Sequence, residues 1–81
     1  MHRLKKAPKK VIGFKQTLKM IERGQTEVVY VAQDVEDKIR LPLLEMSAKM
    51  EVPLVEAESM IALGKACNIQ VGASAVAILK A

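Results

Sequence analysis

The sequence is poor in several residue types that particular protein classes require. It has one cysteine, Cys67, so it cannot form an internal disulfide and is not a small secreted scaffold held by bridges. The longest apolar runs, Val28 to Ala32 and Ala75 to Leu79, are far shorter than the roughly 20 residues that span a bilayer. Lysines interrupt the first 16 residues, which excludes a secretory signal peptide. We therefore expect a cytoplasmic protein with no membrane partner.

Aromatic residues are also scarce, since Phe14 and Tyr30 are the only two. Proteins that stack RNA bases on an exposed sheet, and barrels that bind single strands, need several aromatic side chains. Both modes of nucleic-acid binding are disfavoured. A protein with this composition would instead contact phosphates and base edges.

Catalytic and metal-binding patterns are missing as well. No nucleophile, base and acid can be drawn together from one histidine, His2, and one cysteine. Asp34, Glu36 and Asp37 lack the additional oxygen ligands of a cation loop and read as a turn and a helix start. Gly13 has no glycine partners at the spacing of a phosphate or dinucleotide loop. We expect neither metal nor cofactor, and a buried Cys67 is favoured over an enzyme that uses it as nucleophile.

What the sequence does contain is enough apolar residue for one core and an uneven charge. Its 81 residues, 51% of them hydrophobic, predict a single domain over 1–81. Residues 1–23 carry eight Lys or Arg and one acidic residue, whereas residues 24–81 carry five and eight. This asymmetry favours a surface that faces a polyanion, with a solvated basic tail as the alternative.

The apolar pattern predicts alternating strands and helices. Residues 1–8 are predicted to be a flexible, partly helical basic lead-in. Strands are expected at 10–12, 26–32, 52–56 and 73–79, and helices at 14–23, 41–50 and 60–67. Gly24, after Arg23, is expected to accept the left-handed end of the first helix, and Pro42 is expected in the first turn of the second. Ser59 is expected at the N-cap of the third helix and Asn68 at its left-handed end. Because strands and helices alternate, we predict an α/β fold, a three-layer αβα sandwich with a mixed, mostly parallel sheet of four to five strands.

Two segments carry candidate binding residues. Lys15, Lys19 and Arg23 are four apart and form one basic stripe of a helix whose first turn also holds Gln16. Gly13 allows close backbone approach, and the free N–H groups of a helix start attract phosphate. The second segment is the apolar loop Ile69 to Gly72 before the last strand, which favours contact with a partner. A solvated helix face and a loop that continues into the core remain the alternatives.

Four segments together resemble the ribosomal seven-Ae/thirty-e superfamily, in particular its bacterial YbxF-type branch of kink-turn RNA-binding proteins. They are GFKQTLK (13–19), VVYVAQD (28–34), RLPLLEMSAKMEVPLV (40–55) and SMIALGKACNIQVGASAVAI (59–78), and the likeness extends over about residues 9–80. The resemblance implies an αβα sandwich that binds a kink-turn, a sharply bent RNA with tandem G·A pairs beside a three-nucleotide bulge. It also implies a structured RNA partner, either ribosomal RNA or a riboswitch, a ribosomal-protein-like role and a monomer.

The family motif Gly-x-Asn-Glu-x-x-Lys, which reads the two guanines, corresponds by resemblance to Gly13, Lys15, Gln16 and Lys19. Here Lys-Gln replaces Asn-Glu, which removes a carboxylate that repels phosphate and also an anionic acceptor for guanine. Phe14 is predicted to turn into the core. The family's second contact, a loop that covers a flipped nucleotide, corresponds to Ile69, Gln70, Val71, Gly72 and Ala73. The alternatives from other classes are a protein-interaction module with a generic basic surface, and an enzyme working through Cys67.

Overall fold

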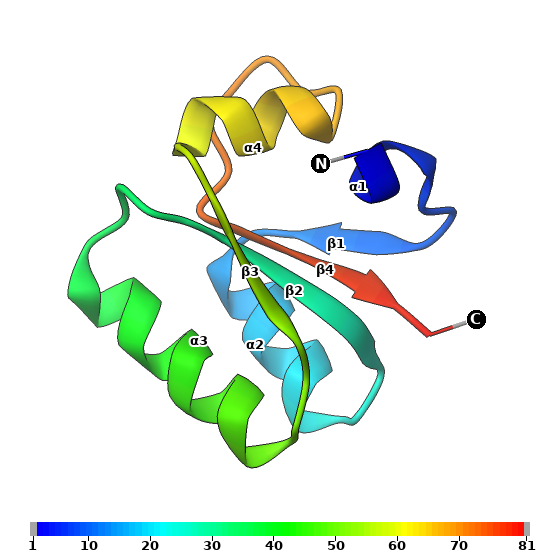
Figure 1. The fold of residues 1–81 in the computed structure, drawn as a ribbon, viewed down its shortest axis with the longest axis vertical. Coiled ribbons are helices and arrows are strands. Elements are labelled where there is room, and N and C mark those ends of the chain that lie inside the picture. Colours follow the sequence, from blue (N-terminus) through cyan, green and yellow to red (C-terminus); the bar gives the residue numbers. More distant parts are fainter. Residues whose placement is uncertain (1, 81) are drawn as a thin grey trace.

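The computed structural model describes residues 2–80, which form a four-stranded sheet and four helices (Figure 1). In chain order the elements are α1 (His2–Lys6), β1 (Lys10–Ile12), α2 (Phe14–Glu22), β2 (Thr26–Ala32), α3 (Asp37–Lys49), β3 (Leu54–Ala57), α4 (Met60–Ala66) and β4 (Ala75–Leu79). Helices α1 and α4 lie on one face of the sheet, and α2 and α3 pack together on the other. The predicted three-layer αβα sandwich with a mixed sheet is therefore confirmed.

The strand order is β1-β4-β2-β3, and the prediction of a mostly parallel sheet is wrong. Only β2 and β3, which are joined through α3, run parallel. The last strand inserts between β1 and β2 and is antiparallel to both. Alternating helices and strands show that crossovers exist, but they do not show which strands become neighbours.

The two central strands supply much of the core. Every residue of β2 except Glu27 is buried, and β4 is buried from Ala75 to Ile78. Strands covered by helices on both faces are apolar on both faces, which is why these two segments read as continuous hydrophobic runs. The predicted strand 26–32 is confirmed, and it lies in the centre of the sheet.

The ends of α2 and α4 follow their local sequence. Arg23 ends α2, and Gly24 adopts the left-handed backbone with φ 69° that a residue without Cβ accepts most easily. At α4 the Ser59 hydroxyl accepts a hydrogen bond from the Ala62 N–H at 3.0 Å, and Asn68 turns the chain with φ 61°. These three predicted caps are confirmed.

Several element boundaries differ from the prediction. Helix α3 begins at Asp37, so Pro42 lies in its second turn and not its first. The helix starts early because Glu36 is extended and its carbonyl accepts hydrogen bonds from the Ile39 and Arg40 N–H groups. The third strand begins two residues later than predicted and the fourth also begins two residues later. Within the lead-in, Leu4 of α1 is fully buried in the core.

None of the helices within residues 2–80 combines the length and the apolar character needed to cross a membrane.

Candidate nucleic-acid interface

Four connections meet at one edge of the sheet, on the left in Figure 1. Strands β1, β2 and β3 end there, and β4, which is antiparallel to β1 and β2, begins there. The edge therefore gathers the start of α2, the loop after β2, the start of α4 and the loop before β4. The two candidate segments of the sequence belong to this set.

A backbone hydrogen bond joins the first candidate segment to the start of β4, two residues after the second candidate segment. The Gly13 N–H donates to the Ala75 carbonyl at 2.8 Å, which continues the β1–β4 pairing one step past the end of β1. Gly13 has φ 113°, a value that L side chains rarely adopt, and no atom lies within 4 Å of the place where a Cβ would stand. The chain thus turns sharply into α2 and leaves open space in front of the helix start.

The side chains of α2 divide into a packed face and an exposed face. Thr17 and Ile21 are buried, and Phe14 and Leu18 pack against the core, as predicted for Phe14. The exposed residues include those of the basic stripe: Lys15, Gln16, Lys19 and Arg23. The three cations of the stripe form no ion pair with any residue in the described range 2–80, so their charge is available to an anion.

Arg23 is separated from the rest of this surface. At 1.5 Å per residue it lies about 12 Å along the helix axis from Lys15. It also follows the last residue of α2, at the end of the helix that is remote from Gly13. Lys15 and Gln16 are in the first turn and Lys19 one turn later, so these three lie nearer than Arg23 to Gly13 and the start of β4.

The loop from Ile69 to Ala73 is packed at its two ends and exposed in the middle. Ile69 packs against the core and Ala73 is buried, whereas Gln70 and Gly72 are exposed. Val71 is 70% exposed, an unusual position for a β-branched apolar side chain. Together with Ile61, 66% exposed on α4, Val71 lines a hollow of about 450 Å³.

Two hydrogen bonds of Met60 hold this loop and Asp34, which follows β2, at the start of α4. The Met60 carbonyl accepts from the Ala73 N–H at 2.9 Å, and the Met60 N–H donates to Oδ1 of Asp34 at 2.8 Å. Gly64 lets the loop approach closely, because a Cβ there would lie 2.0 Å from the Val71 carbonyl oxygen. The role of Asp34 as a brace between β2 and α4 was missed from the sequence, and the only signal was its place directly after a buried strand.

The acidic residues and Cys67, considered above as metal ligands and as a nucleophile, do not form a reactive site in the described residues 2–80. Residues 2–80 contain no cluster of three or more His, Cys, Asp or Glu side chains able to hold a metal. Glu36 precedes α3 and lies 3.6 Å from the Lys38 ammonium, with both side chains largely exposed. Cys67 is 7% exposed, and burial raises the pKa of its thiol while the nearby Lys10 charge opposes that shift. A thiol held neutral in this way is a poor nucleophile.

The fold and this edge define a three-layer αβα protein with an exposed basic helix start beside an apolar loop. Residues 1–81 match the model of the ribosomal protein L7Ae/L30e/S12e/Gadd45 family, and the chain belongs to that family. This is the superfamily that the sequence motifs resemble.

Individual relatives agree with this assignment. The RNA-binding protein YbxF of Geobacillus stearothermophilus is 45% identical over 74 residues, which are 91% of this chain and 90% of that protein. An RNA-binding protein of Geobacillus sp. strain WCH70 is 43% identical over the same shares of the two chains. The solved structure of the Giardia lamblia 15.5kD RNA binding protein superimposes with a TM-score of 0.87 at 31% identity, over 99% of this chain and 68% of that one. Given these relatives, the chain is not an enzyme, and catalysis through Cys67 is set aside.

Proposed function

We propose that this protein binds kink-turn RNA with the surface formed by the start of α2 and the loop 69–73. In this role it is a monomeric, ribosomal-protein-like factor of the cytoplasm that stabilises the bent form of ribosomal RNA or of a riboswitch. Family membership and the names of the relatives support RNA as the partner. The charge of the N-terminal third, with eight Lys or Arg against one acidic residue over 1–23, supports a polyanion.

The observation that carries the proposal is the hydrogen bond from the Gly13 N–H to the Ala75 carbonyl at 2.8 Å. It holds the start of α2 beside the start of β4, the strand that follows the loop 69–73, although Gly13 and Ala75 are about sixty residues apart in the sequence. On this surface the open space before Gly13 admits the RNA, and the helix start and Lys15 attract its phosphates. Gln16, whose amide both donates and accepts, reads a base edge in the widened groove.

Lys19 and the loop complete the assignment. Lys19 lies one turn beyond Lys15 on the exposed face of α2 and contacts the backbone of the RNA. Val71, exposed beside α4, covers the flipped nucleotide of the bulge, and Gln70 supplies polar contact at its rim. An unstacked base loses its neighbours in the helix, and an apolar side chain restores part of that contact.

The test is a titration of a fluorescent kink-turn RNA beside a control RNA whose two G·A pairs are changed to Watson–Crick pairs. We expect the kink-turn to bind at least about tenfold more tightly, or roughly 1.4 kcal/mol. Equal binding of both RNAs, with both lost as salt is raised, would reduce the surface to a generic phosphate patch.

A variant pair assigns that preference to named residues. Lys15→Ala with Gln16→Ala should abolish the difference between the two RNAs, because it removes a phosphate contact and the base-reading amide together. Lys49→Ala with Lys80→Ala removes charge outside the site and should preserve it. Unchanged discrimination in the first pair, in a folded protein, refutes the assignment.

A protein-interaction module is the second candidate, and the exposed apolar pair Ile61 and Val71 favours it. That function requires a protein partner whose binding survives loss of Lys15, Lys19 and Arg23. Kink-turn selectivity in the titration above decides against it.

A further inference from the structure

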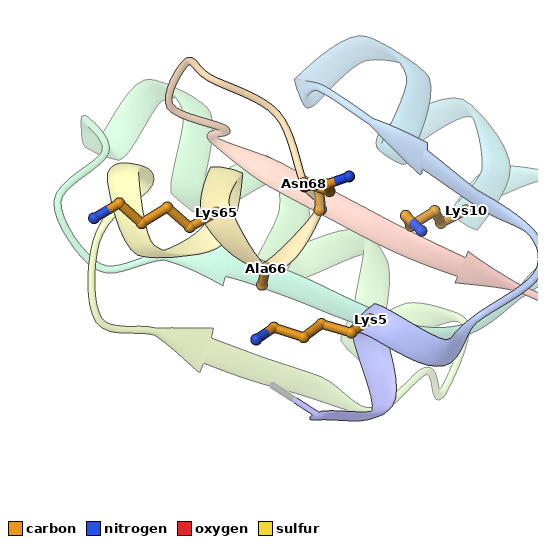
Figure 2. A pocket seen from close by; sticks show the side chains of 6 residues that line it. Lys5, Lys10, Lys65, Ala66 and Asn68 are labelled. Carbon is orange, nitrogen blue, oxygen red and sulfur yellow. The ribbon is translucent and has the colours of Figure 1, made fainter.

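Three lysines from three different elements line one cavity on the face of the sheet that carries α1 and α4. Lys5 comes from α1, Lys10 from β1 and Lys65 from α4, around a volume of about 290 Å³ (Figure 2). Ala66, Cys67 and Asn68 complete the lining, which contains no carboxylate. The ion pairs found within residues 2–80 use none of these lysines. In Figure 2 the Lys65 side chain extends along α4 away from Lys10, so the three unpaired charges spread over this face of the molecule and together attract an anion.

At the end of α4 that faces this cavity, backbone carbonyl groups are already engaged in hydrogen bonds. The last carbonyls of a helix normally repel an anion. Here the Lys65 carbonyl accepts from the Asn68 N–H at 3.0 Å and the Gly64 carbonyl from the Ile69 N–H at 3.1 Å. Asn68 lines the same cavity as Lys10, and its side-chain amide can donate a further hydrogen bond.

Lys65 connects this cavity to the proposed RNA surface. Besides the cavity, it lines the hollow of about 450 Å³ with Ile61 and residues 69–72. A strand of RNA in contact with Val71 can therefore continue along α4 and reach the three lysines without leaving the protein.

We infer that Lys5, Lys10 and Lys65 bind backbone phosphates of the RNA beyond the kink, and so form a second contact site on the α1 and α4 face. The inference rests on the proposed function, since it requires RNA at the loop 69–73. The site recognises phosphate and no base, because lysine is a point charge without an acceptor. A small phosphate ligand has the same chemistry, and the experiment separates the two sources.

The experiment compares two double variants. One carries Lys5→Gln and Lys65→Gln, both at exposed positions, and the other carries Lys49→Gln and Lys80→Gln, which removes equal charge elsewhere. Each protein is titrated over a range of salt with long-stemmed kink-turn RNA and with the control RNA that lacks G·A pairs. Loss of two phosphate contacts should weaken low-salt binding about tenfold and reduce the slope of log affinity against log salt by roughly 1.8. The ratio of the two RNA affinities should remain that of the unmodified protein. The Lys49 and Lys80 variant should keep both affinity and slope.

The possible failures are distinct. If the unmodified protein prefers the kink-turn but the Lys5 and Lys65 variant keeps the full slope, the second site is refuted and the proposed function stands. If the unmodified protein does not prefer the kink-turn, the proposed function is refuted together with this inference. Inorganic pyrophosphate, titrated alone and followed by amide NMR, gives the last outcome. Saturable shifts at Lys10 and Asn68, with an unchanged RNA slope, assign the cavity to a small phosphate ligand and overturn the RNA assignment.

Discussion

Replacing Gly64 by alanine tests the close packing of the loop on α4. The new Cβ would lie 2.0 Å from the Val71 carbonyl oxygen and 3.1 Å from its carbonyl carbon. Both atoms belong to the backbone, so the loop must move and a side-chain rotation cannot relieve the contact. Overpacking of this kind costs about 3 kcal/mol at the upper end of its range, and the better helix propensity of alanine returns about 1 kcal/mol.

The net loss of about 2 kcal/mol corresponds to a fall in Tm of roughly 8–16 °C for a domain of this size. Circular dichroism during heating measures that change. In the RNA titration, performed well below the lower Tm, the variant should bind kink-turn RNA more weakly, because the displaced loop carries Val71.

Gly24→Ala is the matched control. Gly24 has φ 69° but no atom within 4 Å of an added Cβ, so its penalty is backbone strain of about 1 kcal/mol. We expect a smaller fall in Tm, roughly 4–8 °C, and unchanged RNA binding, because Gly24 lies at the end of α2 that is remote from the loop. A Gly64→Ala protein with the same Tm as the unmodified chain would refute the packing argument. So would equal RNA defects in the two variants.

Four further predictions concern stability and reactivity. Leu4→Ala removes a fully buried side chain of α1 and should lower the free energy of unfolding, measured in urea, by about 2–5 kcal/mol. The control Lys6→Ala changes an exposed residue and should have little effect. Equal urea midpoints for the two variants would show that α1 does not contribute to the core. Asp34→Ala leaves the Met60 N–H without its acceptor and should cost about 1 kcal/mol in the same assay, most of it restored by Asp34→Asn. Because burial raises the pKa of Cys67 above its ordinary value of 9.0, alkylation of the native protein at pH 8 should be far slower than in urea. The unfolded thiol ionises first, so this group's contribution to stability is present below pH 9 and is lost as the pH rises further, which urea titrations at increasing pH will measure.

Local signals predicted the parts of the fold that depend on local chemistry. The β-branched run at 26–32, the end of α2 at Arg23 and Gly24, and the caps Ser59 and Asn68 each depend on a few neighbouring residues, and all were found as predicted. The positions of the candidate binding residues were accessible in the same way, since exposure of Lys15 and Lys19 follows from helical spacing.

What the sequence could not predict depends on distant partners. Strand direction is decided by which strands become neighbours, and the insertion of β4 beside β1 has no local signature. Leu4 is buried by packing with α4, but a single apolar residue among charged ones has no periodicity to detect. The lysine cavity likewise joins positions 5, 10 and 65, which no sequence window brings together.

The central place of β4 has a consequence for how the chain acquires its structure. Before residues 75–79 are available, β1 has no strand partner and β2 can pair only with β3. The sheet therefore closes only through contacts between residues distant in the sequence, which slows folding relative to a helical bundle of the same length. The same step brings Ala75 to Gly13. A nascent chain that lacks this strand would carry its basic residues on an unfinished scaffold, and the proposed RNA-binding surface would form only when the fold is complete.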